Sequence, residues 1–201
     1  MIYVNCQLNH FDLTAAWPLL SQQRRDHLMH YRREADRRSG AAAYLLLCQG
    51  LHEEYGILTP PLFTFGPQGK PQLDTSNLDL PLSVYFSLSH CEEAAVCAID
   101  TYPVGIDVEM LTAYDPQLLS ATMSPREQQT ILSAERPDIA FTRLWTMKEA
   151  LLKCIGTGIT DDLTTVLERL PTDQYTFSTF QFFSDSDKEG IYTLCEQLHT
   201  Y

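Results

Sequence analysis

Features that would place a chain in a membrane or in the secretory pathway are missing from this sequence of 201 residues. Its first residues show neither the basic start nor the apolar run of a secretion signal. The longest unbroken apolar run, residues 41–48, is far shorter than the roughly 20 residues that span a membrane as a helix. We therefore expect a cytoplasmic protein that takes no membrane partner.

Paired cysteine motifs are also absent. The chain has six cysteines, none of them in a C-x-x-C pair, and most lie inside apolar runs. This pattern favours reduced, buried thiols in a cytosolic protein and argues against a zinc site. The cysteines are at positions 6, 48, 91, 97, 154 and 195.

Positive charge is scarce and unevenly placed. The chain has 14 Lys and Arg residues against 26 Asp and Glu, a net charge of −12, which argues against a nucleic-acid partner. Six arginines nevertheless fall within residues 24–38. Such a cluster is typical of a site for a small polyanion or an acidic protein. A solvated helix face, balanced by Asp26, Glu34 and Asp36, explains the same window, and composition leaves both interpretations open.

Hydrophobic residues make up 44% of the chain, enough for a folded core in one large domain or two small ones. Local patterns predict an α+β fold in which both halves run from a strand through helices to further strands. Tyr102 and Pro103 interrupt the pattern, so we place a boundary there, between residues 1–103 and residues 104–201. Helices are expected at 21–33, 37–55, from 124 onward and at 138–155. Strands are expected at 3–8, 63–65, 84–89, 94–100, from 104 onward, and at 163–170, 175–184 and 190–198, the sheet near 175–184 being covered on both faces.

Two acidic motifs indicate chemistry. In Val-Gly-Ile-Asp-Val-Glu at 104–109, strand geometry puts Asp107 and Glu109 on one face. In the second, Trp145, Glu149 and Lys153 share one helix stripe. If the two elements face each other, three carboxylates converge, and oxygen ligands of this kind suit Mg²⁺. Either motif alone is also explained by a solvated strand face or by an ordinary helix ion pair.

Four motifs stand in a fixed order along the chain. They are Gly-Lys-Pro at 69–71, Phe-Ser-Leu-Ser-His at 86–90, Val-Gly-Ile-Asp-Val-Glu at 104–109 and Trp-x-x-Lys-Glu-Ala-x-x-Lys at 145–153. The set resembles the 4′-phosphopantetheinyl transferases of the longer, surfactin-synthetase-activating type over residues 20–160. The last 40 residues carry no motif.

The resemblance implies a monomer of two similar α+β lobes related by a pseudo-two-fold axis, with the active site in the cleft between them. It implies Mg²⁺ as cofactor and transfer of the phosphopantetheine arm of coenzyme A to a serine of an apo acyl or peptidyl carrier protein. Adenosine 3′,5′-bisphosphate would be released.

The same resemblance assigns roles to single residues. The metal ligands would be Asp107, Glu109 and Glu149. Glu149 is also our choice of general base, with Glu109 as the alternative, and Lys153 would stabilise the leaving group. Coenzyme A would be bound by Arg38 at its 3′-phosphate and elsewhere by Lys70, Ser89, His90, Lys148 and Lys153. Arg24, Arg25 and His27 match the family's first-lobe lysines only loosely, and Trp145 is expected in the core.

Two other functions use the same residues: a Mg²⁺-dependent phosphohydrolase of nucleotides or pyrophosphates, and a non-catalytic module that binds carrier proteins. The carrier would dock either on the arginine cluster or on an apolar segment after Met110. The apolar residues of that segment are Leu111, Tyr114, Leu118, Leu119 and Met123.

Overall fold

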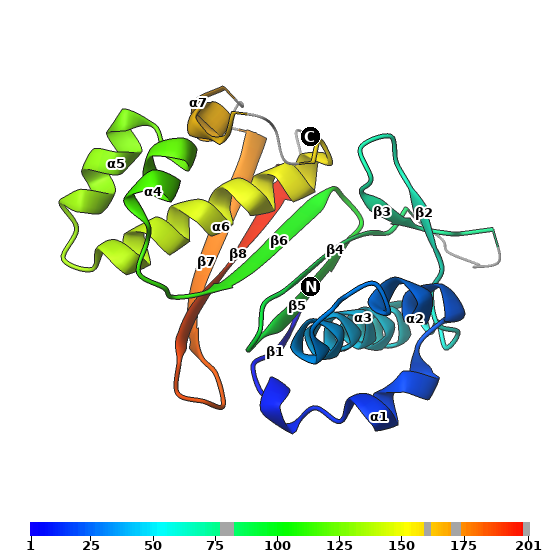
Figure 1. Cartoon of the computed structure of the whole chain (residues 1–201). Coiled ribbons are helices and arrows are strands. Elements are labelled where there is room, and N and C mark those ends of the chain that lie inside the picture. The colour runs from blue at the N-terminus through cyan, green and yellow to red at the C-terminus, as the bar shows by residue number, and fades with distance from the viewer. Residues whose placement is uncertain (77–82, 159–161, 170–173, 199–201) are drawn as a thin grey trace.

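A computed structural model describes residues 1–76, 83–158, 162–169 and 174–198. The first half contains β1 (Ile2–Asn5), α1 (Leu13–Ala16), α2 (Gln22–Leu28), α3 (Glu34–Tyr55), β2 (Phe63–Phe65), β3 (Pro71–Leu73), β4 (Tyr85–His90) and β5 (Ala95–Asp100). The second half contains β6 (Val104–Met110), α4 (Pro116–Thr122), α5 (Pro125–Leu132), α6 (Pro137–Ile155), α7 (Val166–Arg169), β7 (Tyr175–Phe183) and β8 (Glu189–Gln197). The predicted α+β class is confirmed (Figure 1).

The two halves share a sheet topology. The first three-stranded sheet has the order β1-β5-β4 and the second the order β6-β8-β7, with antiparallel pairing throughout. In both sheets the first strand of that half pairs with the last, which occupies the middle. Strands β2 and β3 form a separate hairpin. This matching order supports the duplicated organisation, while the division at residue 103 stays a prediction.

Local signals explain where the long helices begin and end. Gly56, with φ of 68°, ends α3, and Gly156, with φ of 82°, ends α6, because glycine adopts this left-handed conformation without a Cβ clash. At the start of α5, the Ser124 side chain accepts from the Glu127 backbone while the Glu127 carboxylate accepts from the Ser124 backbone. This capping box satisfies two amide donors that the first helical turn leaves without partners.

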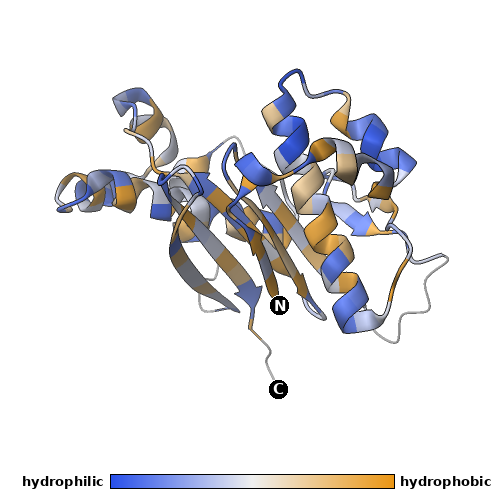
Figure 2. Ribbon diagram, turned by 90° about the horizontal axis from the view of Figure 1, so that it is seen from below, coloured by the Kyte–Doolittle hydropathy of each residue, from blue (hydrophilic) through white to orange (hydrophobic). Residues whose placement is uncertain are grey.

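Small side chains let the two halves approach closely. Helix α3 covers one face of the first sheet and α6 covers one face of the second, so that β4 and β6 meet between them (Figure 1). The opposite face of β5 presents Ala94, Val96 and Ala98 to the apolar face of β6. Hydrophobic residues accordingly gather on the central strands (Figure 2).

Strand β6 reaches β4 through serine side chains rather than through a backbone ladder. The Ile106 amide donates to Ser87 Oγ at 3.0 Å, and the Val108 amide donates to Ser89 Oγ at 3.4 Å. These two hydroxyls satisfy amides of β6 that would otherwise be buried without a partner. They also fix the position of β6 against the strand that ends in His90.

Two expectations are corrected by the structure. Residues 163–169 are helical, not a strand, because the Asp162 carboxylate accepts from the Thr164 amide and from both threonine hydroxyls and so closes a turn; residue 170 lies outside the described residues. Strand β7 is only partly covered on its two faces, since Phe180 and Phe183 are 41% and 64% exposed. Among the described helices, none is both long and apolar enough to cross a membrane.

Candidate functional site

Close contact between β6 and α6 brings the two acidic motifs together. Gly105 packs against α6 so tightly that a Cβ there would lie 1.9 Å from the Ala150 carbonyl oxygen and 2.5 Å from the Cys154 amide nitrogen. The predicted alternation of β6 is confirmed, because Ile106 and Val108 face the core shared with β5 while Asp107 contacts α6. The glycine of this motif therefore allows its carboxylates to reach the helix.

Asp107 is the centre of a buried polar cluster. Its Oδ1 atom accepts from Lys153 Nζ at 2.6 Å and from Ser89 Oγ at 2.8 Å, and Lys153 Nζ also donates to Ser89 Oγ at 2.9 Å. Its Oδ2 atom is buried and has no hydrogen-bond partner among the described residues. Because an unsatisfied buried carboxylate oxygen is costly, this atom indicates that Asp107 has a further ligand.

Two glutamates lie within electrostatic reach of Asp107. Burial, and then the Asp107 charge, raises the pKa of Glu109 to about 7, although the Trp145 side chain donates a hydrogen bond to it. Burial and Asp107 also raise the pKa of Glu149. Trp145 itself is partly buried against Phe141 and the α4–α6 core, as expected. The three carboxylates thus repel one another, as they would around a cation binding site.

The donor set fits Mg²⁺ on these observations. It consists of carboxylate oxygens, one of them buried and unpartnered, in mutually repelling groups. The three carboxylates do not converge on one metal position in this structure, since no cluster of three His, Cys, Asp or Glu in the described part of the chain is arranged to hold a metal. Here the Lys153 ammonium neutralises Asp107. The assignment of Asp107, Glu109 and Glu149 as ligands stays a prediction.

On the other side of β4, a buried arginine lies beside a histidine. Arg24 Nη2 donates to the Gly40 carbonyl at 2.8 Å, and its guanidinium lies over the Tyr44 ring. A Cβ on Gly40 would be 3.4 Å from both Arg24 Nη2 and His90 Nε2, so the guanidinium and the imidazole flank this glycine. The Nε atoms of Arg24 and Arg38 are buried and have no hydrogen-bond partner in the described part of the chain. Unsatisfied buried guanidinium donors fit an anionic ligand such as a phosphate.

Arg24 is the residue that sequence reasoning undervalued. Its loose match to a family lysine was the only signal, whereas the structure turns its side chain inward and leaves Arg25 more accessible on the same helix. The expected roles of Arg38, Ser89 and His90 in coenzyme binding stay predictions. Of the other cluster arginines, Arg33 makes a long, exposed pair with Glu92 at 3.5 Å.

His90 is held as a neutral imidazole. Its Nδ1 atom lies 2.9 Å from Ser39 Oγ. Burial, followed by the charges of Arg24 and Lys153, lowers its pKa from 6.5 to about 4. Between these values the unfolded chain binds more protons than the folded one, so the free energy of unfolding falls as the pH drops from 6.5 to 4.

Replacing His90 by asparagine is therefore expected to flatten the pH dependence of stability in that window by about 3 kcal/mol. Urea unfolding measured between pH 4 and pH 7 tests this. His52→Asn, at an exposed position near the end of α3, is the control and should keep the wild-type slope. Equal slopes in His90→Asn and wild type would contradict the neutral, buried state of His90.

Lys148 was expected at the coenzyme pyrophosphate, and the structure shows this to be wrong. The side chain is 1% exposed, and all three ammonium protons are used. It donates to Glu127 Oε2 at 2.6 Å and to the carbonyls of Thr122 at 2.7 Å and Leu163 at 3.0 Å. Lys148 ties α6 to the helices α4 and α5 and to the segment after α6, and has no donor left for a ligand.

Lys148→Met is expected to lower the free energy of unfolding by about 3–5 kcal/mol, because Glu127 would keep its charge beside an apolar side chain. The double variant Lys148→Met with Glu127→Leu removes both charges and should recover part of that loss. Urea denaturation of the three proteins measures both effects. Unchanged stability in the single variant would mean that Lys148 is not the buried support described above.

Lys70, expected at the coenzyme phosphates, reaches across to the second half of the chain. Its Nζ donates to the carbonyls of Cys154 at 3.2 Å and Val104 at 3.4 Å, and burial lowers its pKa. It forms a wall shared by two cavities, one of about 610 Å³ and one of about 300 Å³. The smaller cavity also contains Glu149 and Lys153, which keeps Lys70 next to the carboxylate cluster. Its contact with coenzyme A stays a prediction.

The apolar segment after Met110 is divided between core and surface. Leu119 and Met123 are buried in the core of the α4–α6 region, so their expected place in a docking surface is wrong. Leu118 is 41% exposed, and Leu111 and Tyr114 are half-buried. A cavity of about 180 Å³ between Leu118 and Glu109 connects this segment to the carboxylate cluster.

Comparison with known proteins identifies the family of this chain. The model of the 4′-phosphopantetheinyl transferase superfamily matches residues 103–196. A 4′-phosphopantetheinyl transferase of Bacillus pumilus is 33% identical over 159 residues, 78% of this chain, and one of Bacillus subtilis is 28% identical over 86% of it. The L-aminoadipate-semialdehyde dehydrogenase-phosphopantetheinyl transferase of Saccharomyces cerevisiae is 32% identical over 74% of the chain.

This chain spans 66%, 76% and 56% of the lengths of those three relatives. The similarity to the first two covers most of both halves of the chain, beyond the residues of the family match. The order of the four motifs and the sequence matches agree. The chain belongs to the 4′-phosphopantetheinyl transferase superfamily.

Proposed function

We propose that this protein transfers the 4′-phosphopantetheine arm of coenzyme A to a serine of an apo carrier protein and releases adenosine 3′,5′-bisphosphate. The observation that carries the proposal is the arrangement of opposite charges on the two sides of β4. Beyond Ser89 lies the carboxylate cluster with the unpartnered oxygen of Asp107. Beyond His90 lies the buried Arg24 guanidinium, whose Nε has no partner among the described residues. A pyrophosphate held by a metal and a separate phosphate held by arginines match these two halves of the site.

The chain's own residues divide the work of the transfer. Arg24, Arg38 and His90 would bind the 3′-phosphate and so fix the adenosine end. Asp107, Glu109 and Glu149 would hold Mg²⁺, which when bound acts as a Lewis acid on the pyrophosphate oxygens. Lys153, whose ammonium is already within 2.9 Å of Ser89 Oγ, would meet the charge that develops on the departing bisphosphate.

A carboxylate must also accept the proton of the attacking serine. Glu149 is our choice, because it lies on α6 one turn before Lys153 and lines the 300 Å³ cavity with it. Glu109, whose pKa of about 7 suits a general base, is the alternative. A positioned base of this kind contributes about 10²–10⁴-fold to a rate.

Incubation with coenzyme A, Mg²⁺ and a panel of apo carrier proteins tests the function by mass spectrometry. The proposal expects one phosphopantetheine on a carrier serine. Breakdown of coenzyme A with the carrier unmodified would support the phosphohydrolase instead. Carrier binding without any change in mass would support the non-catalytic module. The orphaned arginine donors favour the transferase, because they provide a second anion site that pyrophosphate cleavage does not need.

Arg24→Gln is expected to weaken binding of adenosine 3′,5′-bisphosphate about 10- to 100-fold, since a charge-assisted phosphate contact contributes about 1.5–3 kcal/mol. Arg25→Gln, one residue further along α2, is the matched control and should change the affinity less than about threefold. Isothermal titration calorimetry measures both. Equal losses in the two variants would show that Arg24 acts through general charge rather than as a specific contact.

The docking surface for the carrier protein, and the cellular location and oligomeric state of this protein, are part of the same proposal. The exposed Leu118 and its half-buried neighbours Leu111 and Tyr114 are one docking candidate, and the exposed arginines Arg32 and Arg33 are the other. A cytoplasmic monomer without nucleic-acid or membrane partners remains our expectation.

A further inference from the structure

Two cysteines of the second half meet beside the 610 Å³ cavity. Cys154 lies near the end of α6 and Cys195 in the middle strand β8, and both pack in the same buried cluster. Both approach the same glycine: Cys195 pairs with Gly105 across the β6–β8 ladder, and the Cys154 amide nitrogen lies 2.5 Å from where a Cβ on Gly105 would be. Both cysteines therefore lie where α6 packs on the β6–β8 ladder, in one buried cluster.

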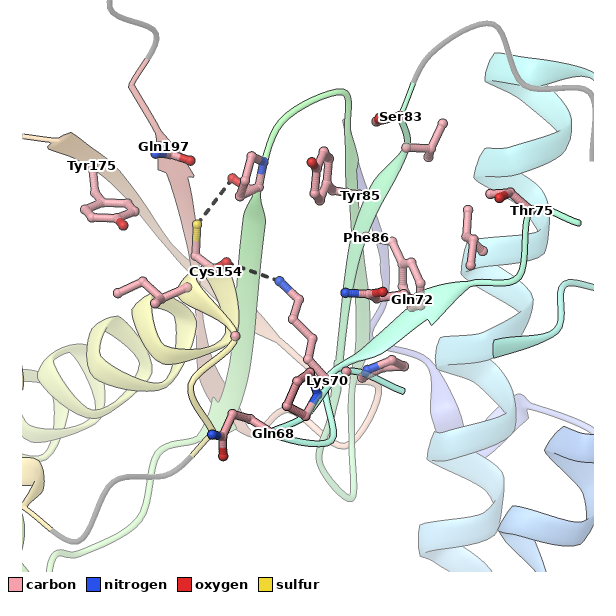
Figure 3. Close-up of a pocket in the computed structure, with 18 residues that line it drawn as sticks. Gln68, Lys70, Gln72, Thr75, Ser83, Tyr85, Phe86, Cys154, Tyr175 and Gln197 are labelled. Carbon is pink, nitrogen blue, oxygen red and sulfur yellow. Dashed lines mark hydrogen bonds between the residues drawn. The ribbon is translucent and has the colours of Figure 1, made fainter. Parts of the chain in front are cut away.

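The cavity gives this pair a route to solution. Cys154 lines it together with Lys70, Pro103 and Gln197, and the Cys154 thiol donates to the Pro103 carbonyl at 3.2 Å (Figure 3). Lys70 bonds the backbone carbonyl of the same cysteine. A small oxidant that enters the cavity thus meets Cys154 at the wall, and Cys195 belongs to the buried cluster in which Cys154 packs.

The charges around the pair favour reaction at Cys154. Interaction with the Cys195 thiol lowers the pKa of Cys154, and Lys70 lowers it further, against the effect of burial. The pKa of Cys195 is raised for the corresponding reason. By contrast, burial raises the pKa of Cys48, in the first half of the chain, to about 12, and that of its neighbour Cys97 as well. Because the thiolate is the reactive form, Cys154 is the more nucleophilic of these thiols.

We propose that Cys154 and Cys195 form an oxidisable dithiol that a peroxide entering the 610 Å³ cavity converts to an intramolecular disulfide. The Cys154 thiolate attacks one peroxide oxygen, the O–O bond breaks, and the departing hydroxide takes the proton of Cys195. The Cys195 thiolate then attacks the sulfur of the Cys154 sulfenic acid, the S–S bond forms, and the departing hydroxide takes up the proton that Cys154 lost on ionising and leaves as water. Two thiols and one hydrogen peroxide yield one disulfide and two water molecules.

The disulfide would change the part of α6 that carries the site. Cys154 follows Lys153, which bonds Asp107, and its carbonyl accepts from Lys70. A new covalent link to β8 fixes the end of α6 at a shorter distance from the sheet than packed thiols require. We expect the rate of phosphopantetheine transfer to fall about tenfold, because misplacing catalytic groups by fractions of an ångström has effects of that order. This consequence rests on the proposed function; the formation of the disulfide does not.

Non-reducing peptide mapping after treatment with hydrogen peroxide tests the proposal. Trypsin releases Cys154 in peptide 154–169 and Cys195 in peptide 189–201, so the disulfide joins two peptides that are otherwise separate. Cys48, Cys91 and Cys97 share peptide 39–126 and provide the internal control, in which any disulfide among them would appear as the loss of two hydrogens. The disulfide-linked peptides are expected to appear before any disulfide within peptide 39–126, and dithiothreitol should separate them.

Cys195→Ala should abolish the joined peptides and leave Cys154 as a sulfenic acid that a dimedone probe labels. Wild-type protein that stays folded in peroxide, yet keeps both thiols open to alkylation after unfolding, would overturn the proposal. Formation of a disulfide within peptide 39–126 at the same rate would also overturn the proposal. If the disulfide forms and no transfer is seen even in reduced enzyme, the proposed function fails while the dithiol stands.

Discussion

Glu149→Gln is expected to lower the rate of phosphopantetheine transfer by at least about 10³-fold, because one substitution removes both a proposed metal ligand and the proposed general base. Affinity for coenzyme A measured without metal should change little, since the arginine site on the other side of β4 is untouched. The amide keeps the size of the side chain, and Glu149 is only half-buried, so folding should survive. Single-turnover loading of an apo carrier protein measures the rate, and calorimetry measures the affinity.

Glu135→Gln is the matched control for this experiment. Glu135 is exposed just before α6 and distant in sequence from the carboxylate motifs, so its loss of charge should leave the rate within about twofold of wild type. Transfer near the wild-type rate in Glu149→Gln would remove Glu149 from both the metal and the base role. In that case Glu109→Gln becomes the decisive variant.

The parts of the fold that the sequence predicts well are those with local causes. Gly56 and Gly156 end their helices by backbone conformation, and the Ser124 capping box starts α5 through contacts within four residues. The strand alternation that separates Asp107 from Ile106 is likewise a property of neighbouring residues. Residues 163–169 are helical although Thr and Val favour strands on average, because the Asp162 side chain imposes a turn.

The site was harder to predict where a side chain's direction depends on packing. Arg24 and Arg25 look alike in sequence, and only the position of Gly40 and the Tyr44 ring turns the former inward. For Lys148, by contrast, helix geometry alone argues against the expected contact with the pyrophosphate. At about 100° per residue, Lys148 points roughly 140° away from Lys153, so the two lysines cannot serve the same pyrophosphate from one stripe. Its ion-pair partner Glu127 lies 21 residues away in the sequence, so no local sequence pattern indicates this contact.

Gly105→Ala is expected to have the largest structural effect of any single methyl group added to this chain. The new Cβ would lie 1.9 Å from the Ala150 oxygen, 3.0 Å from its carbonyl carbon and 2.5 Å from the Cys154 nitrogen. These are backbone atoms of a helix, so no side-chain rotation relieves the clash, and α6 must move away from β6. Overpacking typically costs about 1–3 kcal/mol, and a clash with rigid backbone on this scale should exceed that range.

Gly66→Ala is the matched control, because its Cβ would find its nearest neighbour 3.7 Å away, in ordinary contact. Urea unfolding should separate the two variants by more than about 3 kcal/mol. Whatever Gly105→Ala protein remains folded should also transfer more slowly, since moving α6 away from β6 draws Lys153 and Glu149 away from Asp107. Near-normal stability together with near-normal transfer would mean that the contact between Gly105 and α6 does not set the geometry of the site. A loss of both would show that the glycine of the first acidic motif acts by admitting the helix that bears the second.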